Sequence, residues 1–138
     1  MDEAIHHFEV SLQLQPTQVG VYFSLANAYA ASRQFDKAIR NYEIVLRHMP
    51  DLAPAHAHLA NILATFPERA SEAIRHYDQA IRLNPEYVDA HNGLALVFAQ
   101  GGQLDKAKER WETVLHIEPQ NRIARENLTK LEQMRARP

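Results

Sequence analysis

A proline recurs at nearly constant spacing along this chain of 138 residues, at Pro16, Pro50, Pro85 and Pro119. The three intervals are 34, 35 and 34 residues. A period between about 20 and 50 residues is typical of repeat architectures, in which each unit packs mainly against its neighbours. The spacing therefore predicts a linear array of similar units instead of one compact core.

The segments that precede the four prolines align with one another without gaps. They read DEAIHHFEVSLQLQP, DKAIRNYEIVLRHMP, SEAIRHYDQAIRLNP and DKAKERWETVLHIEP. In each segment an alanine is followed four residues later by an aromatic residue, as in Ala38 and Tyr42. Steps of three and four residues place such side chains on one face of a helix. Each segment is therefore predicted to be an amphipathic helix that ends at its proline, because proline lacks an amide hydrogen.

A second set of related segments predicts another helix at the start of each complete unit. These segments read VYFSLANAYAASRQF, AHAHLANILATFPERA and AHNGLALVFAQGGQL. The predicted units are an isolated second helix at 1–18, complete helix pairs at 19–52, 53–87 and 88–121, and a closing helix at 122–138. The middle unit contains one extra residue between Leu63 and Ala73, and Pro67 is expected to start its second helix, where a missing amide hydrogen costs least.

This pattern resembles the tetratricopeptide repeat, a family of 34-residue helix–turn–helix units. The resemblance covers the whole chain, as three full repeats with a half repeat at each end. It implies an all-α, right-handed superhelical solenoid of antiparallel helix pairs, with about eight helices in a single domain. The early aromatic position departs from the family pattern, since it holds Tyr22 in the first full repeat but His56 and His91 in the next two.

In the geometry that the resemblance implies, the first helix of each repeat lines a concave groove and the second faces outward. The groove positions carry mostly small and polar side chains, which suit a peptide or a partner protein segment. The candidate contact residues are Phe23, Asn27, His58, Asn61, Asp89, Asn92, Leu96 and Gln100. The asparagine amides are expected to hold a peptide backbone because they both donate and accept hydrogen bonds. The alternative is that these asparagines are ordinary solvated polar residues near the middle of a helix and have no role in binding.

Family members that clamp the carboxylate end of heat-shock chaperones use lysine, asparagine and arginine at fixed inner positions. In this sequence only Asn27 matches that pattern, whereas Phe23, His58, Asp89 and Gly93 occupy the other positions. A carboxylate clamp depends on charge-assisted hydrogen bonds from cations, and these positions supply none. The sequence therefore predicts a groove for a partner other than an acidic chain end.

The composition and the motifs exclude several kinds of chemistry. The chain has no cysteine, which removes disulfides, thiolate metal sites and cysteine nucleophiles. It contains neither a glycine-rich phosphate loop nor a nucleophile elbow, and its eight histidines lack metal-ligand spacing. We therefore expect no enzymatic activity, no cofactor and no metal site. The net charge of −2 and the absence of a long apolar run give no case for nucleic acid or membrane insertion.

The two ends of the chain differ in kind. Residues 122–138 combine a narrow apolar stripe with basic side chains and are predicted to cap the last repeat. Residues 1–18 correspond to a second helix without its first helix, so part of their apolar face is expected to be uncovered. Self-association through residues 1–14, with Ile5, Phe8 and Leu12 as contacts, would make the protein a homo-oligomeric structural module. A regulatory segment of a larger enzyme, such as a glycosyltransferase, is a further alternative function.

Overall fold

The computed structural model describes residues 2–137, and within that range it contains eight α-helices, one 3₁₀ turn and no strand. The elements are α1 (Asp2–Leu14), α2 (Val19–Ala31), α3 (Phe35–His48), α4 (Ala53–Leu63), η1 (Pro67–Arg69), α5 (Ala70–Leu83), α6 (Val88–Gln100), α7 (Leu104–Ile117) and α8 (Arg122–Arg135). The prediction of an all-α solenoid with eight helices is confirmed.

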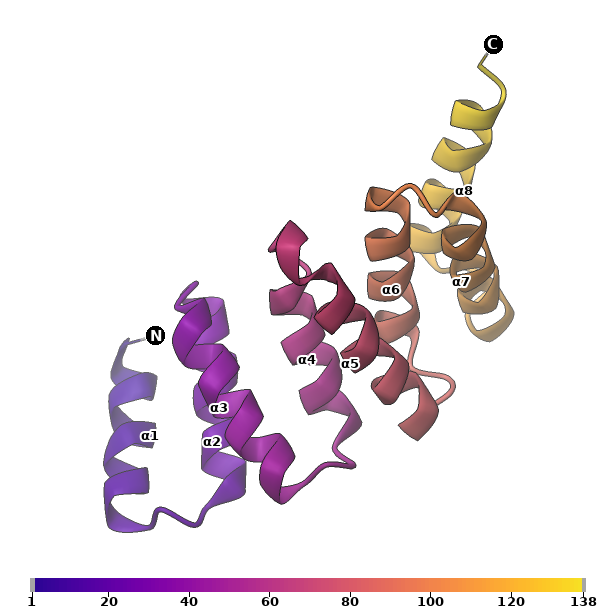
Figure 1. Cartoon of the computed structure of the whole chain (residues 1–138). Helices are drawn as coiled ribbons and strands as arrows, with labels where there is room; N and C mark the ends of the chain where they lie inside the picture. The colour runs from indigo at the N-terminus through magenta and orange to yellow at the C-terminus, as the bar shows by residue number, and fades with distance from the viewer. Residues whose placement is uncertain (1, 138) are drawn as a thin grey trace.

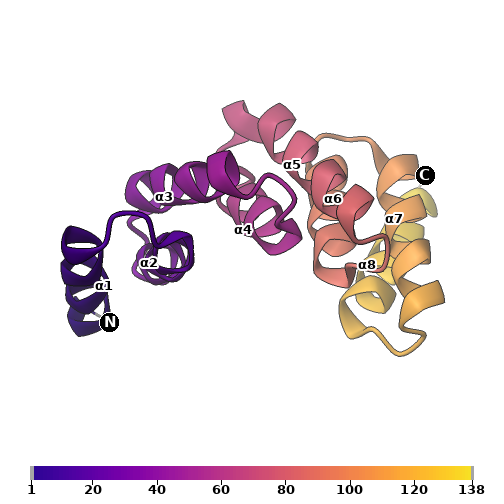
Figure 2. The same cartoon turned by 90° about the horizontal axis from the view of Figure 1, so that it is seen from below.

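The helices stand in chain order along an extended row, and the two termini lie at opposite ends of the molecule (Figure 1). The most extensive contacts join α2 to α3, α4 to α5, and α6 to α7. Smaller contacts join α2 to α4 and α4 to α6, which are the first helices of successive pairs. Seen from below, the row bends along its length (Figure 2). The first helices therefore form one layer along the row.

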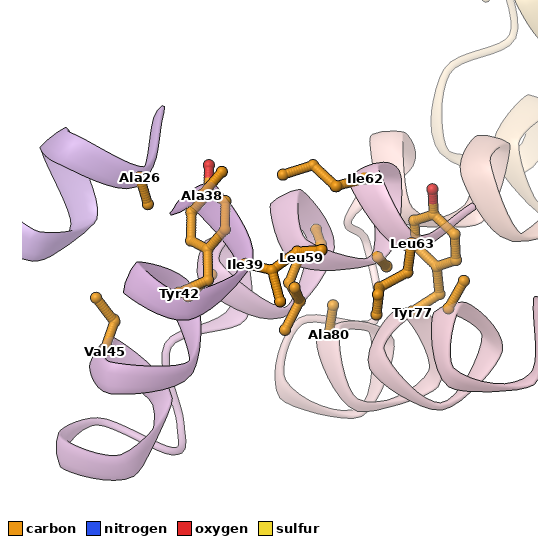
Figure 3. Packing of buried hydrophobic residues seen from close by; sticks show 14 of the residues in the cluster. Ala26, Ala38, Ile39, Tyr42, Val45, Leu59, Ile62, Leu63, Tyr77 and Ala80 are labelled. Carbon is orange, nitrogen blue, oxygen red and sulfur yellow. The ribbon is translucent and has the colours of Figure 1, made fainter. Parts of the chain in front are cut away.

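Small and aromatic residues at repeating positions close each helix pair. Ala26 on α2 and Ala38 on α3 are both fully buried, and so are their counterparts in the other two pairs. These counterparts are Ala60, Ala73, Ala95 and Ala107. An alanine lets two helix backbones approach closely, and the aromatic residue one turn later fills the space beside it. Figure 3 shows the aromatic residues of the first two pairs, Tyr42 and Tyr77, among the buried aliphatic side chains.

The turn between α4 and α5 differs from the prediction at Pro67. This proline starts the short 3₁₀ turn η1, and α5 begins three residues later, at Ala70. Phe66 has an extended backbone (φ −109°, ψ 108°), as the residue before a proline prefers. Arg69 then leaves helical geometry (φ −107°, ψ 14°), so η1 is not continuous with α5. The one-residue insertion of this unit falls in the same turn.

Two buried histidines replace the early aromatic residue of their units and fasten the end of the preceding helix. His56 Nε2 lies 2.8 Å from the carbonyl oxygen of Pro50, and His91 Nε2 lies 2.9 Å from that of Pro85. Because a carbonyl only accepts, Nε2 carries the hydrogen and Nδ1 is left as an acceptor. His76 approaches Nδ1 of His56 at 3.0 Å, and Arg110 approaches Nδ1 of His91 at 3.5 Å. His76 is half-buried beside His56.

Candidate functional site in the concave groove

A cavity of about 320 Å³ opens on the first-helix layer between α2 and α4. It brings together three of the predicted contact residues, Asn27, His58 and Asn61. The other lining residues are Ala30, Phe35, Tyr42, Ile62 and Thr65. None of these lining residues carries a positive charge, so the cavity offers hydrogen bonds and apolar surface instead of an anion site.

The carbonyl oxygen of Asn27 is fully engaged inside the protein. It accepts a hydrogen bond of 2.5 Å from the Tyr42 hydroxyl, and Nδ1 of His58 lies 2.9 Å away. Both lone pairs of the side-chain carbonyl are therefore used. The amide NH₂ of Asn27 is left as the group that faces the cavity, and it can only donate.

Asn61 repeats this arrangement one unit further along the groove. Its carbonyl oxygen accepts a hydrogen bond of 2.5 Å from the hydroxyl of Tyr77, which is buried on α5. Burial raises the pKa of both Tyr42 and Tyr77 well above the usual range, so the two hydroxyls remain donors. Asn61 itself is exposed, and its NH₂ group is free to donate to a ligand.

His58 lies between the two asparagines and presents an acceptor. Its Nδ1 donates to the Asn27 carbonyl, so the neutral ring keeps a lone pair on Nε2. The ring stacks on Phe23 with centroids 5.6 Å apart and meets the edge of Tyr42 at 6.1 Å. Burial lowers the pKa of His58, and the carboxylate of Asp89 opposes this only in part. The imidazole is therefore neutral near pH 7.

The remaining predicted residues lie in different places. Asn92 is only 5% exposed, and neither polar atom of its side chain has a partner among the described residues. It therefore contributes almost nothing to the open groove surface, in contrast to the expectation. Leu96 is 41% exposed and lines, with Gln100, a separate cavity of about 170 Å³ between α6, α7 and α8. Asp89 is exposed near His58.

The tyrosine hydroxyls that orient the asparagine amides were not predicted from the sequence. A signal for them was present in the repeat alignment. Asn27 and Tyr42 occupy the same two positions as Asn61 and Tyr77 in the next unit, and both positions change together in the third unit, to Leu96 and Trp111. A joint change at two aligned positions indicates that the two side chains touch.

The predicted self-association residues lie mostly inside the chain. Ile5 is buried, and Phe8 and Leu12 are half-buried against the same core as α2. The large apolar side chains of α1 that stay exposed are Val10 and Leu14. The expectation of an uncovered apolar face is therefore wrong for Ile5, because α2 packs on that side of the helix.

Two properties of the described residues bear on what the site can hold. Within residues 2–137, no group of three or more histidine, aspartate or glutamate side chains is placed to hold a metal ion. No helix in the same range combines the length and the apolar character that crossing a bilayer requires.

Comparisons with known proteins place the fold. The family model described as TPR repeat matches residues 69–102. The first TPR domain of Spaghetti (RPAP3), solved with the HSP90 peptide SRMEEVD, is 24% identical with a TM-score of 0.81, over 87% of this chain and 94% of that domain. The structure of MamA is 29% identical with a TM-score of 0.81, over 86% of this chain and 68% of that one.

A third solved structure is longer than this chain. A tetratricopeptide repeat protein from Parabacteroides merdae is 17% identical with a TM-score of 0.86, and the match covers 95% of this chain but 52% of that protein. A comparison with curated proteins gave no match. At these identities the likeness concerns the architecture.

Proposed function

This chain is a solenoid of tetratricopeptide repeats, and we propose that it is a non-catalytic scaffold that binds an extended peptide or partner segment in the groove between α2 and α4. The observation that carries the proposal is the fixed orientation of the Asn27 and Asn61 amides. The RPAP3 domain, which has the same architecture, holds a peptide in its solved structure.

The three polar groups of the groove match the alternation of a peptide backbone. Asn27 and Asn61 would donate their NH₂ groups to peptide carbonyl oxygens, and His58 Nε2 would accept from a peptide N–H between them. Since the Tyr42 and Tyr77 hydroxyls already hold the carbonyl ends, little side-chain entropy is lost when a ligand binds. Phe23 and Phe35 would supply apolar contact beside this row.

The charge of the groove selects against an acidic ligand. No lysine or arginine lines the cavity, and the carboxylate of Asp89 lies near His58. A carboxylate bound there would lose its hydration without gaining a cation. We therefore expect neutral or basic segments to bind, and the peptide SRMEEVD to bind this chain weakly if at all.

The test begins with peptides selected from a random displayed library against the full chain. The affinity of the best peptide is then measured by calorimetry for the wild type and for Asn61→Asp. This substitution keeps an oxygen for the Tyr77 hydroxyl and replaces the free donor by an acceptor. We expect about a tenfold or larger loss of affinity, because a peptide carbonyl would then face a carboxylate oxygen.

Asn84→Asp is the matched control, since it makes the same chemical change at an exposed residue that follows α5, away from the groove. It is expected to leave the affinity unchanged. Equal affinities of the wild type and Asn61→Asp, with both proteins folded by circular dichroism, would refute the groove assignment.

A further inference from the structure

The helix α1 exposes a face that the equivalent helices of the complete repeats bury. Ala4 aligns with alanines on α3, α5 and α7 that are 0% exposed, yet Ala4 itself is exposed. Phe8 is half-buried, whereas its aligned residues Tyr42, Tyr77 and Trp111 are 1–2% exposed. Ser11 is also half-buried, whereas its aligned residues Val45, Ala80 and Val114 are fully buried.

The rest of α1 sits as a second helix of this fold should. Ile5 is 8% exposed and its aligned residue on α3, Ile39, is 6% exposed. The side of α1 that meets the following repeat is therefore complete. Only the side that a second helix turns toward its own first helix is open, so the shape that would cover it is that of a first helix.

The helix α8 lies in the position of a first helix, and the second helix that would pair with it is absent from the described residues. It packs on α7 through Ala124 and Leu131, in the place of a first helix, and no further helix packs on it among the described residues. Thr129 aligns with Ala26, Ala60 and Ala95, the buried alanines at which each first helix meets its second helix. Thr129 is exposed, so α8 lacks the partner that α1 resembles.

The two open helices carry opposite charge. Helix α1 holds Asp2, Glu3 and Glu9 and neither lysine nor arginine. Helix α8 holds four basic side chains and two acidic ones. In the complete pairs the first helix ends where the second begins, so Asp2 and Glu3 of a docked α1 would lie beside the end of α8 near Arg135, whose guanidinium also pairs with Asp105 on α7.

The two helices cannot meet within one molecule, because they occupy its opposite ends (Figure 1). We propose that α1 of one copy docks on α8 of a second copy in the way that a second helix docks on its first helix. Such a junction would continue the solenoid from copy to copy.

This contact is heterologous, since it joins two different surfaces, so it extends into open chains of copies instead of closing as a symmetric dimer. Thr129 and Glu132 make the α8 face more polar than the first helices inside the chain. The association is therefore weak and reversible, and salt reduces it by screening the opposite charges.

The absence of cysteine allows a direct test by cross-linking. Ala4→Cys and Thr129→Cys are made as separate variants of the full chain, because the aligned alanines mark the place where paired helices meet. Mild oxidation of the mixture should give mainly the disulfide-linked heterodimer, and the double variant should give a ladder of oligomers. Asp78→Cys, at an exposed position on α5, replaces Thr129→Cys in the control mixture and should give little cross-linking to Ala4→Cys.

Sedimentation of the protein without cysteine provides the second measurement. The average mass should rise with concentration, and Thr129→Trp should lower the association constant about tenfold by blocking the close contact. Because Thr129 is exposed in the single copy, this variant should keep its helical signal and melting temperature. The proposal is overturned if the wild type stays monomeric at millimolar concentration, or if Ala4→Cys links to itself as readily as to Thr129→Cys.

Discussion

The first two complete repeats and the third build the same helix contact from different chemistry. In the first two, a groove asparagine accepts a hydrogen bond from a buried tyrosine, between Asn27 and Tyr42 and between Asn61 and Tyr77. In the third, Leu96 and Trp111 occupy these positions. The indole Nε1 of Trp111 is buried with no hydrogen-bond partner among the described residues.

This difference teaches that the groove surface and the core are not independent. The amides of Asn27 and Asn61 are each oriented by a tyrosine hydroxyl that comes from the core. Where the core residue is Trp111, the aligned groove position is Leu96, so an apolar side chain replaces the amide of the first two repeats at the cavity between α6, α7 and α8.

The largest expected effect comes from Gly93→Ala, which disturbs the packing of Tyr77, the buried tyrosine of the second repeat. A Cβ atom at position 93 would lie 2.5 Å from the ring of Tyr77. The ring must shift, and its hydrogen bond to Asn61 is lost or strained. We expect the free energy of unfolding to fall by about 2 to 3 kcal/mol, the range for overpacking plus one lost hydrogen bond.

Urea denaturation followed by circular dichroism measures this change. Gly20→Ala is the matched control, because Gly20 lies in α2 and a Cβ there meets nothing within 4 Å. The control should be stabilised by up to about 1 kcal/mol through helix propensity. Equal stability changes in the two variants would show that Gly93 is not needed for the approach of Tyr77.

The second largest expected effect is a loss of folding stability in acid. It depends on His76, whose aligned residue in the third repeat is Arg110. Burial, and then the neighbouring His56 ring and the guanidinium of Arg75, lower the pKa of His76 from 6.5 to about 4, with Glu72 in opposition. At pH values between about 4 and 6.5, His76 is protonated in the unfolded chain but neutral in the folded chain. Stability therefore falls as the pH drops from 6.5 to 4, and the lowered pKa values of His58 and His91 act in the same direction.

His76→Arg gives the second repeat the same side chain that the third repeat has at the aligned position, Arg110. The guanidinium can donate to His56 Nδ1, as Arg110 does to His91, and it does not titrate in this range. We expect the loss of stability between pH 7 and pH 4.5 to shrink by about 1 to 2 kcal/mol. Thermal unfolding at several pH values measures it, with the exposed His116→Arg as control. An unchanged pH dependence would assign the acid sensitivity to other groups.

The sequence predicted the architecture well because helix pairs repeat with a fixed period. Alanine and aromatic residues that recur at steps of four define each buried face, so Ala38 and Tyr42 could be placed without coordinates. The turn at Pro67 was harder to predict, because an inserted residue can be absorbed by a longer helix or by a separate turn.

The candidate site was only partly predictable, because helix periodicity gives direction but not hydrogen-bond partners. Asn61 and Asn92 are both polar residues on first helices, yet Asn61 is exposed in the groove and Asn92 is buried. Asn61 is the ninth residue of its unit and Asn92 the fifth, so at 3.6 residues per turn they differ by about 40° around the helix, and this small rotation separates groove from interior. The orientation of the amides depends on a tyrosine 15 or 16 residues away, which no local pattern reveals.

The third prediction tests the paired change itself through a double-mutant cycle. Trp111→Tyr alone leaves a smaller side chain beside α8, and Leu96→Asn alone places an amide without a hydroxyl partner. The double variant should recreate the asparagine–tyrosine hydrogen bond of the other repeats. We expect a favourable coupling of about 1 kcal/mol between the two substitutions in urea denaturation. Strictly additive effects would mean that the joint difference between the repeats has no energetic basis.

The smallest expected effect comes from substitutions in the turns between the paired helices of the first and third repeats, where Arg33 and Gly102 are aligned. Both have positive φ, 59° for Arg33 and 80° for Gly102, which favours glycine. The backbone bonds match as well, with Gln34 N 2.9 Å from Tyr29 O and Gln103 N 2.8 Å from Phe98 O. Arg33→Gly should therefore stabilise the chain, although it also removes the contact of the guanidinium with Phe35 at 5.3 Å.

The net gain for Arg33→Gly is expected to be about 0.5 kcal/mol, since relief of a left-handed residue is worth about 1 kcal/mol and an exposed cation–π contact somewhat less. Gly102→Ala, in the equivalent turn, should lose about 1 kcal/mol because it imposes the same strain on the third repeat. Chemical denaturation of both variants measures the two signs together. A loss of stability in Arg33→Gly would show that the contact of Arg33 with Phe35 outweighs the backbone strain at position 33. The first turn would then be stabilised by its side chains, unlike the third turn, which depends on the backbone freedom of Gly102.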